Sequence, residues 1–178
     1  MDAHDTVRPS LSASETAVRS IDVMAVGDLA DFEAVVAPGA VNREDAVEPP
    51  ACRVGGPEGF HATALWLRAA YSDLRHEMDH VVAERDLVVV HATMSGCHTG
   101  DFVLHGPDGT VDRVWAPTGR TFAVAQTHWF RLADGLVTEH WAVRDDLGQS
   151  LQLGWVPPTP RYLVRCALAT RRARRALR

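Results

Sequence analysis

The sequence predicts an α+β protein in which helices come first and an antiparallel sheet follows. Three observations lead to this prediction: a helix-start pattern near the N-terminus, a second stretch with apolar residues at helical spacing, and a later run of segments rich in β-branched residues. The chain has 178 residues, enough for one domain with a hydrophobic core. We expect this domain at residues 12–156, between a disordered segment at 1–11 and an arginine-rich, helical tail at 157–178.

Two helices are predicted in the first part of the chain. The first should begin at Ser12, because Ser12 and Glu15 form the pattern of a capping box. Apolar residues at helical spacing extend it to about Val36. Residues 44–57 contain three prolines and two glycines, which is typical of a loop. A second helix is then expected at about 58–71.

After the second helix the pattern becomes that of strands. Residues 87–94 are rich in valine and indicate a buried strand. Residues 100–119 carry several turn signals and are predicted to be a long connection. Two further strands are expected at 120–132 and 136–143, and a short helix at 148–153.

The charges are unevenly distributed along the chain. All 18 basic residues are arginines, and seven of them follow Pro160, where no acidic residue occurs. The tail therefore carries about +7 and the rest of the chain about −12, which argues against a nucleic-acid-binding core. The tail could be a solvated helix, or it could bind an anionic surface.

Composition also bears on location. No apolar run reaches the length that spans a bilayer, and the N-terminus lacks the apolar stretch of a secretory signal. The three cysteines are widely spaced and odd in number, which indicates free thiols in a reducing compartment. We expect a cytoplasmic protein.

One motif suggests a metal. His76-Glu77-Met78-Asp79-His80 matches H-E-x-x-H, in which a helix brings two imidazoles to one zinc ion. The valines that follow favour a strand instead. There His76, Met78 and His80 would share a face, with the two imidazoles about 13 Å apart. We therefore expect no bound metal, and a zinc hydrolase is kept as a third hypothesis.

Residues 127–148 carry most of the functional information. The segment from Leu132 to Leu136 fits a three-residue hairpin loop that ends with Gly135 in the left-handed conformation. His128 then lies opposite His140, because cross-strand partners share a face. That face presents Gln126, His128, Phe130, Thr138, His140 and Ala142, and the other presents Thr127, Trp129, Arg131, Glu139, Trp141 and Val143. A two-residue loop would instead place His128 opposite Trp141.

The candidate catalytic residues are His128, His140 and Asp145. Two histidines on one half-buried face could transfer protons, or each could satisfy a hydrogen bond in the core. Asp145 and Asp146 could also cap the helix that begins near Leu147.

Several segments along residues 15–154 match a known family in order and spacing. They are 36–42 after the first helix, 56–60 before the second, 71–74, 116–120, the hairpin 130–141 and the closing segment 145–154. On these residues the chain resembles the SnoaL-like polyketide cyclase (ester cyclase) family of the nuclear transport factor 2-like superfamily. The resemblance implies a curved antiparallel sheet, wrapped by the N-terminal helices into a cone-shaped barrel with an internal apolar pocket. It also implies a homodimer that forms through the sheet.

The resemblance further implies a chemistry. Characterised family members close a ring by intramolecular aldol condensation without metal or cofactor, and a histidine and an aspartate on the last two long strands transfer protons. His128 matches the histidine. Ala142 stands where many relatives carry an acid, and Asp145 is the nearest substitute in the sequence.

Two functions follow from these observations. The first is cofactor-independent, cyclase- or isomerase-type catalysis on a small hydrophobic, polyketide-like molecule. His128 would exchange protons with His140 or Asp145 as its partner, and Gln126 would donate a hydrogen bond to an enolate or carbonyl oxygen. Trp66, Phe130 and Trp141 are the candidate lining residues. The alternative is a non-catalytic ligand-binding or dimerisation domain that has lost the family's acid.

Overall fold

The structure is a computed structural model in which residues 11–176 are described. The disorder predicted for residues 1–11 falls outside this range apart from Leu11. Five strands form one sheet in the order β1-β7-β6-β3-β2, and β4 and β5 form a separate hairpin. The fold class is α+β as predicted, with a curved sheet that does not close into a barrel. Within the described range, no helix has the length and apolar character needed to cross a membrane.

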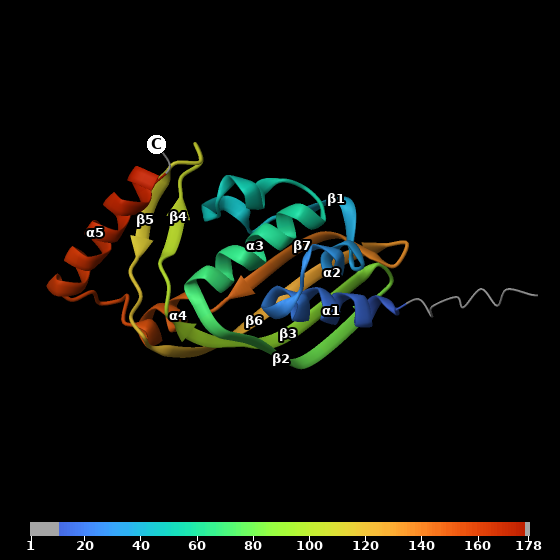
Figure 1. The fold of residues 1–178 in the computed structure, drawn as a ribbon. Coiled ribbons are helices and arrows are strands. Elements are labelled where there is room, and N and C mark those ends of the chain that lie inside the picture. The colour runs from blue at the N-terminus through green and yellow to red at the C-terminus, as the bar shows by residue number, and fades with distance from the viewer. Residues whose placement is uncertain (1–10, 177–178) are drawn as a thin grey trace, which may run out of the picture.

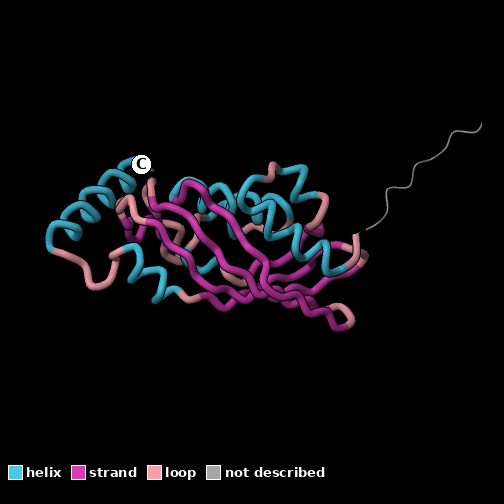
Figure 2. The backbone as a smooth tube through the Cα atoms, turned by 90° about the horizontal axis from the view of Figure 1, so that it is seen from below, coloured by secondary structure: helices cyan, strands magenta, loops and turns pink. Residues whose placement is uncertain are grey.

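The elements form a sheet layer, a helix layer and an end piece. The helices are α1 (Ala13–Val26), α2 (Leu29–Glu33), α3 (Pro57–Ala70), α4 (Asp146–Leu153) and α5 (Pro160–Ala176), with 3-10 turns η1 (Asp45–Val47) and η2 (Pro50–Arg53). The strands are β1 (Val36–Asn42), β2 (Tyr71–Glu84), β3 (Leu87–His98), β4 (Phe102–His105), β5 (Val111–Trp115), β6 (Thr121–Ala133) and β7 (Leu136–Arg144). Helices α1, α2 and α3 cover one face of the sheet, and β4, β5 and α5 stand at one end (Figure 1). The view in Figure 2 shows the sheet curving beneath the helices.

The first helical segment is shorter than predicted. The capping box of Ser12 and Glu15 is present, but α1 ends at Gly27, whose extended backbone breaks the helix. A second capping box, formed by Asp28 and Asp31, starts the short helix α2. The prediction of one helix to Val36 is therefore wrong. Apolar residues continue at helical spacing through Gly27 and Asp28, where one helix ends and the next begins.

The pairing of strand β1 positions the site. The strand runs parallel to β7, with Val36 beside Val137 and Asn42 beside His140. The register shifts between these two pairs, where Gly39 has a φ of 78°. This irregularity lets the strand bend and still deliver Asn42 to the side of His140.

The two central strands show which face of the sheet is the inner one. Along β3 every second residue is buried, and Val88, Val90 and Ala92 pack with α1. Strand β6 has the same alternation, with Gln126 at a buried position. A buried amide on an otherwise apolar face needs hydrogen-bond partners, so Gln126 marks the position of a polar site.

The hairpin β6–β7 differs from the predicted register. Its loop has two residues, Asp134 and Gly135, both with positive φ, and Ala133 pairs with Leu136. Asp-Gly favours this tight turn over the three-residue loop that we expected. The register then shifts at Thr138, so that His128 lies opposite Ala142 rather than opposite His140. This bulge restores the alternation, which is why His128 and His140 still share a face as predicted.

The connection predicted at 100–119 is instead the hairpin β4–β5, and α5 packs against it. Tyr162, Cys166 and Ala169 of α5 are buried, and the Tyr162 hydroxyl donates to the carbonyl of Ala116 at 2.8 Å. Trp155, in the connection between α4 and α5, is buried as well. Residues Pro160–Ala176 are helical, and the side of α5 away from Tyr162, Cys166 and Ala169 is exposed.

Replacing Tyr162 with Phe should destabilise the protein by about 1–3 kcal/mol, because the buried carbonyl of Ala116 loses its donor while the ring is retained. Urea unfolding monitored by tryptophan fluorescence measures the change. Leu163→Ala, on the exposed side of the same helix, is the control and should stay within about 0.5 kcal/mol of the wild type. Equal stability of Tyr162→Phe and the wild type would show that α5 does not hold the hairpin through this bond.

Candidate functional site

A cavity of about 270 Å³ lies between the inner face of the sheet and helices α1 and α3. Hairpin β4–β5 contributes Phe102, Leu104 and Trp115 to its wall. Apolar atoms form most of the lining surface, and the other apolar side chains in it are Ile21, Met24, Val47, Phe60, Trp66, Leu67, Met94, Phe130 and Trp155. The Trp66 indole donates to the carbonyl of Val103 at 2.8 Å and so fastens α3 to β4. A cavity of this lining suits a small hydrophobic molecule.

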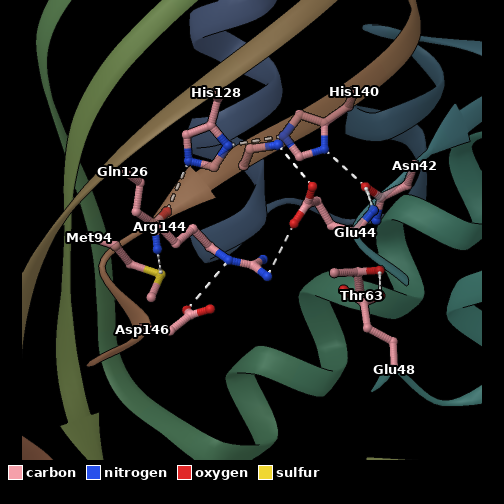
Figure 3. A network of polar contacts seen from close by, with 11 residues as sticks. Asn42, Glu44, Glu48, Thr63, Met94, Gln126, His128, His140, Arg144 and Asp146 are labelled. Carbon is pink, nitrogen blue, oxygen red and sulfur yellow. Dashed lines mark hydrogen bonds and ion pairs between the residues drawn. The ribbon is translucent and has the colours of Figure 1, made fainter. Parts of the chain in front are cut away.

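One wall of the cavity carries a chain of hydrogen bonds (Figure 3). His140 Nδ1 lies 3.0 Å from Asn42 Oδ1, and His140 Nε2 lies 3.0 Å from His128 Nδ1. His128 Nε2 in turn lies 2.9 Å from Gln126 Oε1. The chain therefore links β1, β7 and β6 through two imidazole rings.

Asn42 gives the chain a direction. Its Oδ1 accepts the backbone N–H of Glu44 at 3.3 Å, so this oxygen is held as an acceptor. His140 must then carry its proton on Nδ1 and leave Nε2 as an acceptor. His128 donates to that nitrogen from its own Nδ1. The basic end of the chain is therefore His128 Nε2.

The hydrogen bond between the Gln126 amide and His128 Nε2 depends on the protonation state of His128. The Gln126 oxygen can accept a bond from His128 Nε2 only when this nitrogen carries a proton, which makes the ring an imidazolium. When His128 is neutral, its Nε2 needs a donor, and a half-turn of the Gln126 amide supplies one. The amide can thus satisfy either protonation state of the histidine. In the orientation seen, the Gln126 nitrogen points to the Met94 sulfur at 3.4 Å.

Burial keeps both histidines neutral at rest. It lowers the pKa of His140 to about 3, and burial together with the neighbouring His140 lowers the pKa of His128 well below the usual value. His76 also lines the cavity, from β2, and burial lowers its pKa to about 4. His76 Nδ1 is buried without a hydrogen-bond partner. The site therefore presents neutral imidazoles that can accept protons.

Charged groups gather at one edge of the cavity. Glu44 Oε1 accepts the backbone N–H of Ala142 at 3.0 Å, and Glu44 Oε2 lies 3.2 Å from Arg144. Arg144 lies 3.7 Å from Asp146 on its other side. The Arg144 side chain is 34% exposed, so this cluster is partly solvated. Both oxygens of Glu44 are engaged, although its carboxylate lies beside the position that many relatives fill with an acid.

The structure brings together five of the seven candidate residues. Gln126, Phe130, His128, His140 and Trp66 all line the cavity.

The other two candidates lie elsewhere. Trp141 stacks on Trp129 with ring centroids 6.0 Å apart, on the face of the sheet away from the cavity. Asp145 is exposed and caps α4, where its carboxylate accepts the backbone N–H of Gly148 at 2.8 Å. Asp145 does not reach His128.

The H-E-x-x-H segment is in strand β2, as predicted. The register shifts between Met78 and His80, and this extra residue turns His80 away from the cavity that His76 lines. His80 stacks on His91 with ring centroids 6.4 Å apart. The prediction that His76 and His80 share a face is therefore wrong, and the two rings cannot bind one metal ion together.

Sequence reasoning missed several polar residues of the cavity, namely Asn42, Glu44, Glu48 and Arg144, and it considered His76 only as a metal ligand. Two of them, Glu44 and Glu48, lie in a proline-rich stretch whose composition indicates only a loop. Asn42 ends the short strand β1, and its role depends on a neighbour 98 residues away. Arg144 is the one with a local signal, because it follows His140 and Ala142 on the same face of β7.

Comparison with known proteins identifies relatives. The sequence model described as "SnoaL-like polyketide cyclase" matches residues 15–153. Aklanonic acid methyl ester cyclase DnrD of Streptomyces peucetius is 34% identical over 107 residues, which cover 59% of this chain and 66% of that protein.

Solved structures agree with the sequence comparison. TsrD from Streptomyces laurentii is 26% identical with a TM-score of 0.62, covering 78% of this chain and 92% of TsrD. IdmH from Streptomyces antibioticus is 25% identical with a TM-score of 0.61, covering 81% of this chain and 99% of IdmH.

The fold and the cavity define a protein of the nuclear transport factor 2-like class, with a curved sheet and helices around an internal pocket. Within that class, the chain belongs to the SnoaL-like polyketide cyclase family.

The free energy of unfolding should fall as the pH is lowered from about 6.5. The pKa of His140 in the folded protein is about 3, whereas an unfolded histidine takes up its proton near 6.5. Between these values the unfolded state binds more protons. Stability that is fully present above pH 6.5 is therefore lost on acidification, by up to about 1.4 kcal/mol per pH unit for each such histidine.

Urea unfolding at several pH values between about 4 and 7 measures this slope. His140→Gln should make the slope shallower by about one proton. Identical slopes in the wild type and His140→Gln would contradict the burial of a neutral His140.

Proposed function

We propose that this protein closes a ring in a small polyketide-derived ester by intramolecular aldol addition, without metal or cofactor. The observation that carries the proposal is the position of His128, a neutral imidazole in the wall of the cavity. Its hydrogen bond to His140, which is in turn bonded to Asn42, leaves Nε2 as the basic nitrogen of His128. Membership of the family and the activity named for the relative DnrD support the same reaction class.

The first step would be proton abstraction. His128 Nε2 takes a proton from a carbon next to substrate carbonyl groups, and the C–H electrons form an enolate. The new imidazolium keeps its Nδ1–H on His140 Nε2, so its charge stays hydrogen-bonded inside the cavity. The Gln126 amide leaves Nε2 and can donate its N–H to the enolate oxygen.

Ring closure would follow in the same pocket. The enolate carbon attacks a second carbonyl carbon of the same molecule, the new C–C bond forms, and the second carbonyl oxygen takes a proton. The cavity would hold the substrate folded so that its two reacting carbons meet, and the aromatic walls of the cavity would exclude water. His140 acts here as a positioning residue, because it sets the tautomer of His128.

Asp145 is left out of this proposal, because its carboxylate caps α4 and is exposed. The alternative, a ligand-binding domain without catalysis, is favoured by one observation: Ala142 lies opposite His128 and offers no acid. The two functions differ in turnover, not in binding.

We also propose that the protein is a homodimer through the outer face of the sheet, where Trp129 and Trp141 stack on each other. The supporting observation is that this face lies away from the helices. Light scattering of the purified protein measures the mass directly. A monomeric mass at micromolar concentration would contradict the dimer.

The wild-type protein should convert aklanonic acid methyl ester to a cyclised product, and His128→Ala should lose turnover by about 100-fold or more, because the proposal assigns the carbon-bound proton to His128. Chromatography of substrate and product measures the rate. His80→Ala, an exposed histidine on β2, is the matched control and should keep full activity.

Binding of the ester without any turnover by the wild type would favour the ligand-binding alternative. Full activity of His128→Ala would contradict the role given to His128.

A further inference from the structure

Glu48 is a buried carboxyl group in the cavity wall that the histidine chain does not include. It lies between the turns η1 and η2, its residue is 2% exposed, and it lines the same cavity as His128. A carboxyl group in such a place needs a partner for its charge or must be neutral.

No cation among the described residues pairs with the Glu48 carboxylate. The guanidinium of Arg53 binds the backbone carbonyl of Glu48, at 3.1 and 2.8 Å, and not the side chain. Arg144 is engaged by Glu44 at 3.2 Å and offsets only part of the cost of burial. Burial therefore raises the pKa of Glu48 to about 7, with Asp45 adding to the rise and Thr63 and Arg144 opposing it.

The Thr63 hydroxyl lowers the pKa of Glu48 only when it donates to the carboxylate, and a second acceptor competes for its proton. The Thr63 hydroxyl lies 2.5 Å from Glu48 Oε2 and 3.2 Å from the carbonyl oxygen of Gly59, one turn earlier in α3. One hydroxyl proton cannot serve two acceptors. If Glu48 carries a proton, it donates to Thr63 and Thr63 donates to Gly59, so each of these two contacts has its own donor.

The positions of the two groups suit opposite ends of one reaction. His128 projects from the sheet, whereas Glu48 lies beside Thr63 on the α3 side (Figure 3). A substrate between the sheet and α3 would have a base on one side and an acid on the other. Two groups whose environments hold different protonation states are the usual arrangement for acid–base catalysis.

We propose that Glu48 is the proton donor of the cyclisation: it protonates the carbonyl oxygen that becomes the new hydroxyl group. This inference rests on the proposed function. As the enolate carbon forms its bond to the carbonyl carbon, the C–O π electrons move to oxygen, and that oxygen takes the Glu48 proton. The reaction leaves a carboxylate at Glu48 and an imidazolium at His128. Proton return from the imidazolium to the carboxylate, through solvent after product release, restores both groups.

Glu48→Gln tests the donor, because the amide keeps the shape and the hydrogen bonding but cannot give up a proton at this pH. Its kcat should fall by about 100-fold with KM within a few-fold of the wild type, while Glu33→Gln, an exposed control on α2, stays fully active. Wild-type kcat should fall as the pH rises through about 7, as Glu48 loses its proton, and Glu48→Gln should lack this limb. The other titratable or charged groups around Glu48 are Asp45, Cys52, Arg53 and Arg144.

Infrared spectroscopy supplies a readout that does not depend on activity. At pH 6 the wild type should show the carbonyl band of a protonated carboxyl group, which disappears on titration through about pH 7 and is absent from Glu48→Gln. Thr63→Val keeps the carboxyl group but removes its neighbour, so the band should shift. This second variant covers the case in which Glu48→Gln fails to fold.

The outcomes separate the two claims. An active wild type with an equally active Glu48→Gln, or a wild type whose spectrum lacks the band at pH 6, would overturn the donor role and leave the proposed function standing. A wild type without any turnover would overturn both.

Discussion

The hydrogen bond between His140 Nδ1 and Asn42 Oδ1 is the contact on which the site depends. It exists because β1 runs parallel to β7 and places Asn42 beside His140, and the backbone bond from Arg43 N to His140 O secures the same pairing. Asn42 cannot turn its amide without losing the Glu44 N–H. The positions of the donors and acceptors in the hydrogen bonds from Asn42 to His128 therefore depend on where the short strand β1 ends.

The second constraint is the separation of charge from the cavity interior. The ionised groups Glu44, Arg144 and Asp146 satisfy one another at a partly solvated edge. Deeper in the wall, burial lowers the pKa of His128 and raises the pKa of Glu48, and both shifts favour the neutral form. Neutral groups can exchange protons with a carbon acid in a low-dielectric pocket, where a developing charge interacts strongly with fixed hydrogen bonds. The hairpin β4–β5 maintains this environment by closing the end of the pocket with Phe102 and Trp115, and α5 packs against the hairpin.

Much of the fold could be predicted from the sequence because its signals are local. The capping box at Ser12, the valine-rich strand β3 and the alternation around His128 each depend on neighbours within a few residues. The placement of His128, His140 and Gln126 on one face could be predicted because it depends on the alternation of side chains along the two strands. The cap formed by Asp28 and Asp31 is a local signal, but it lies inside a continuous apolar pattern that indicates one long helix. The bulge at Thr138 and the packing of Tyr162 could not be predicted, because tertiary contacts decide them. The same holds for Asn42 and Glu48, whose meaning comes from the strands and helix that surround them.

The central claim is that Asn42 fixes the proton positions of both histidines. Long-range proton–nitrogen correlation spectra of the protein with ¹⁵N-labelled histidine, recorded at neutral pH, test it most directly. The account predicts that His140 and His128 are both neutral and carry their proton on Nδ1, and that the resonances of His140 lose this preference in Asn42→Ala. A His140 ring that carries its proton on Nε2 in the wild type would contradict the account, because His128 would then have no basic nitrogen facing the cavity.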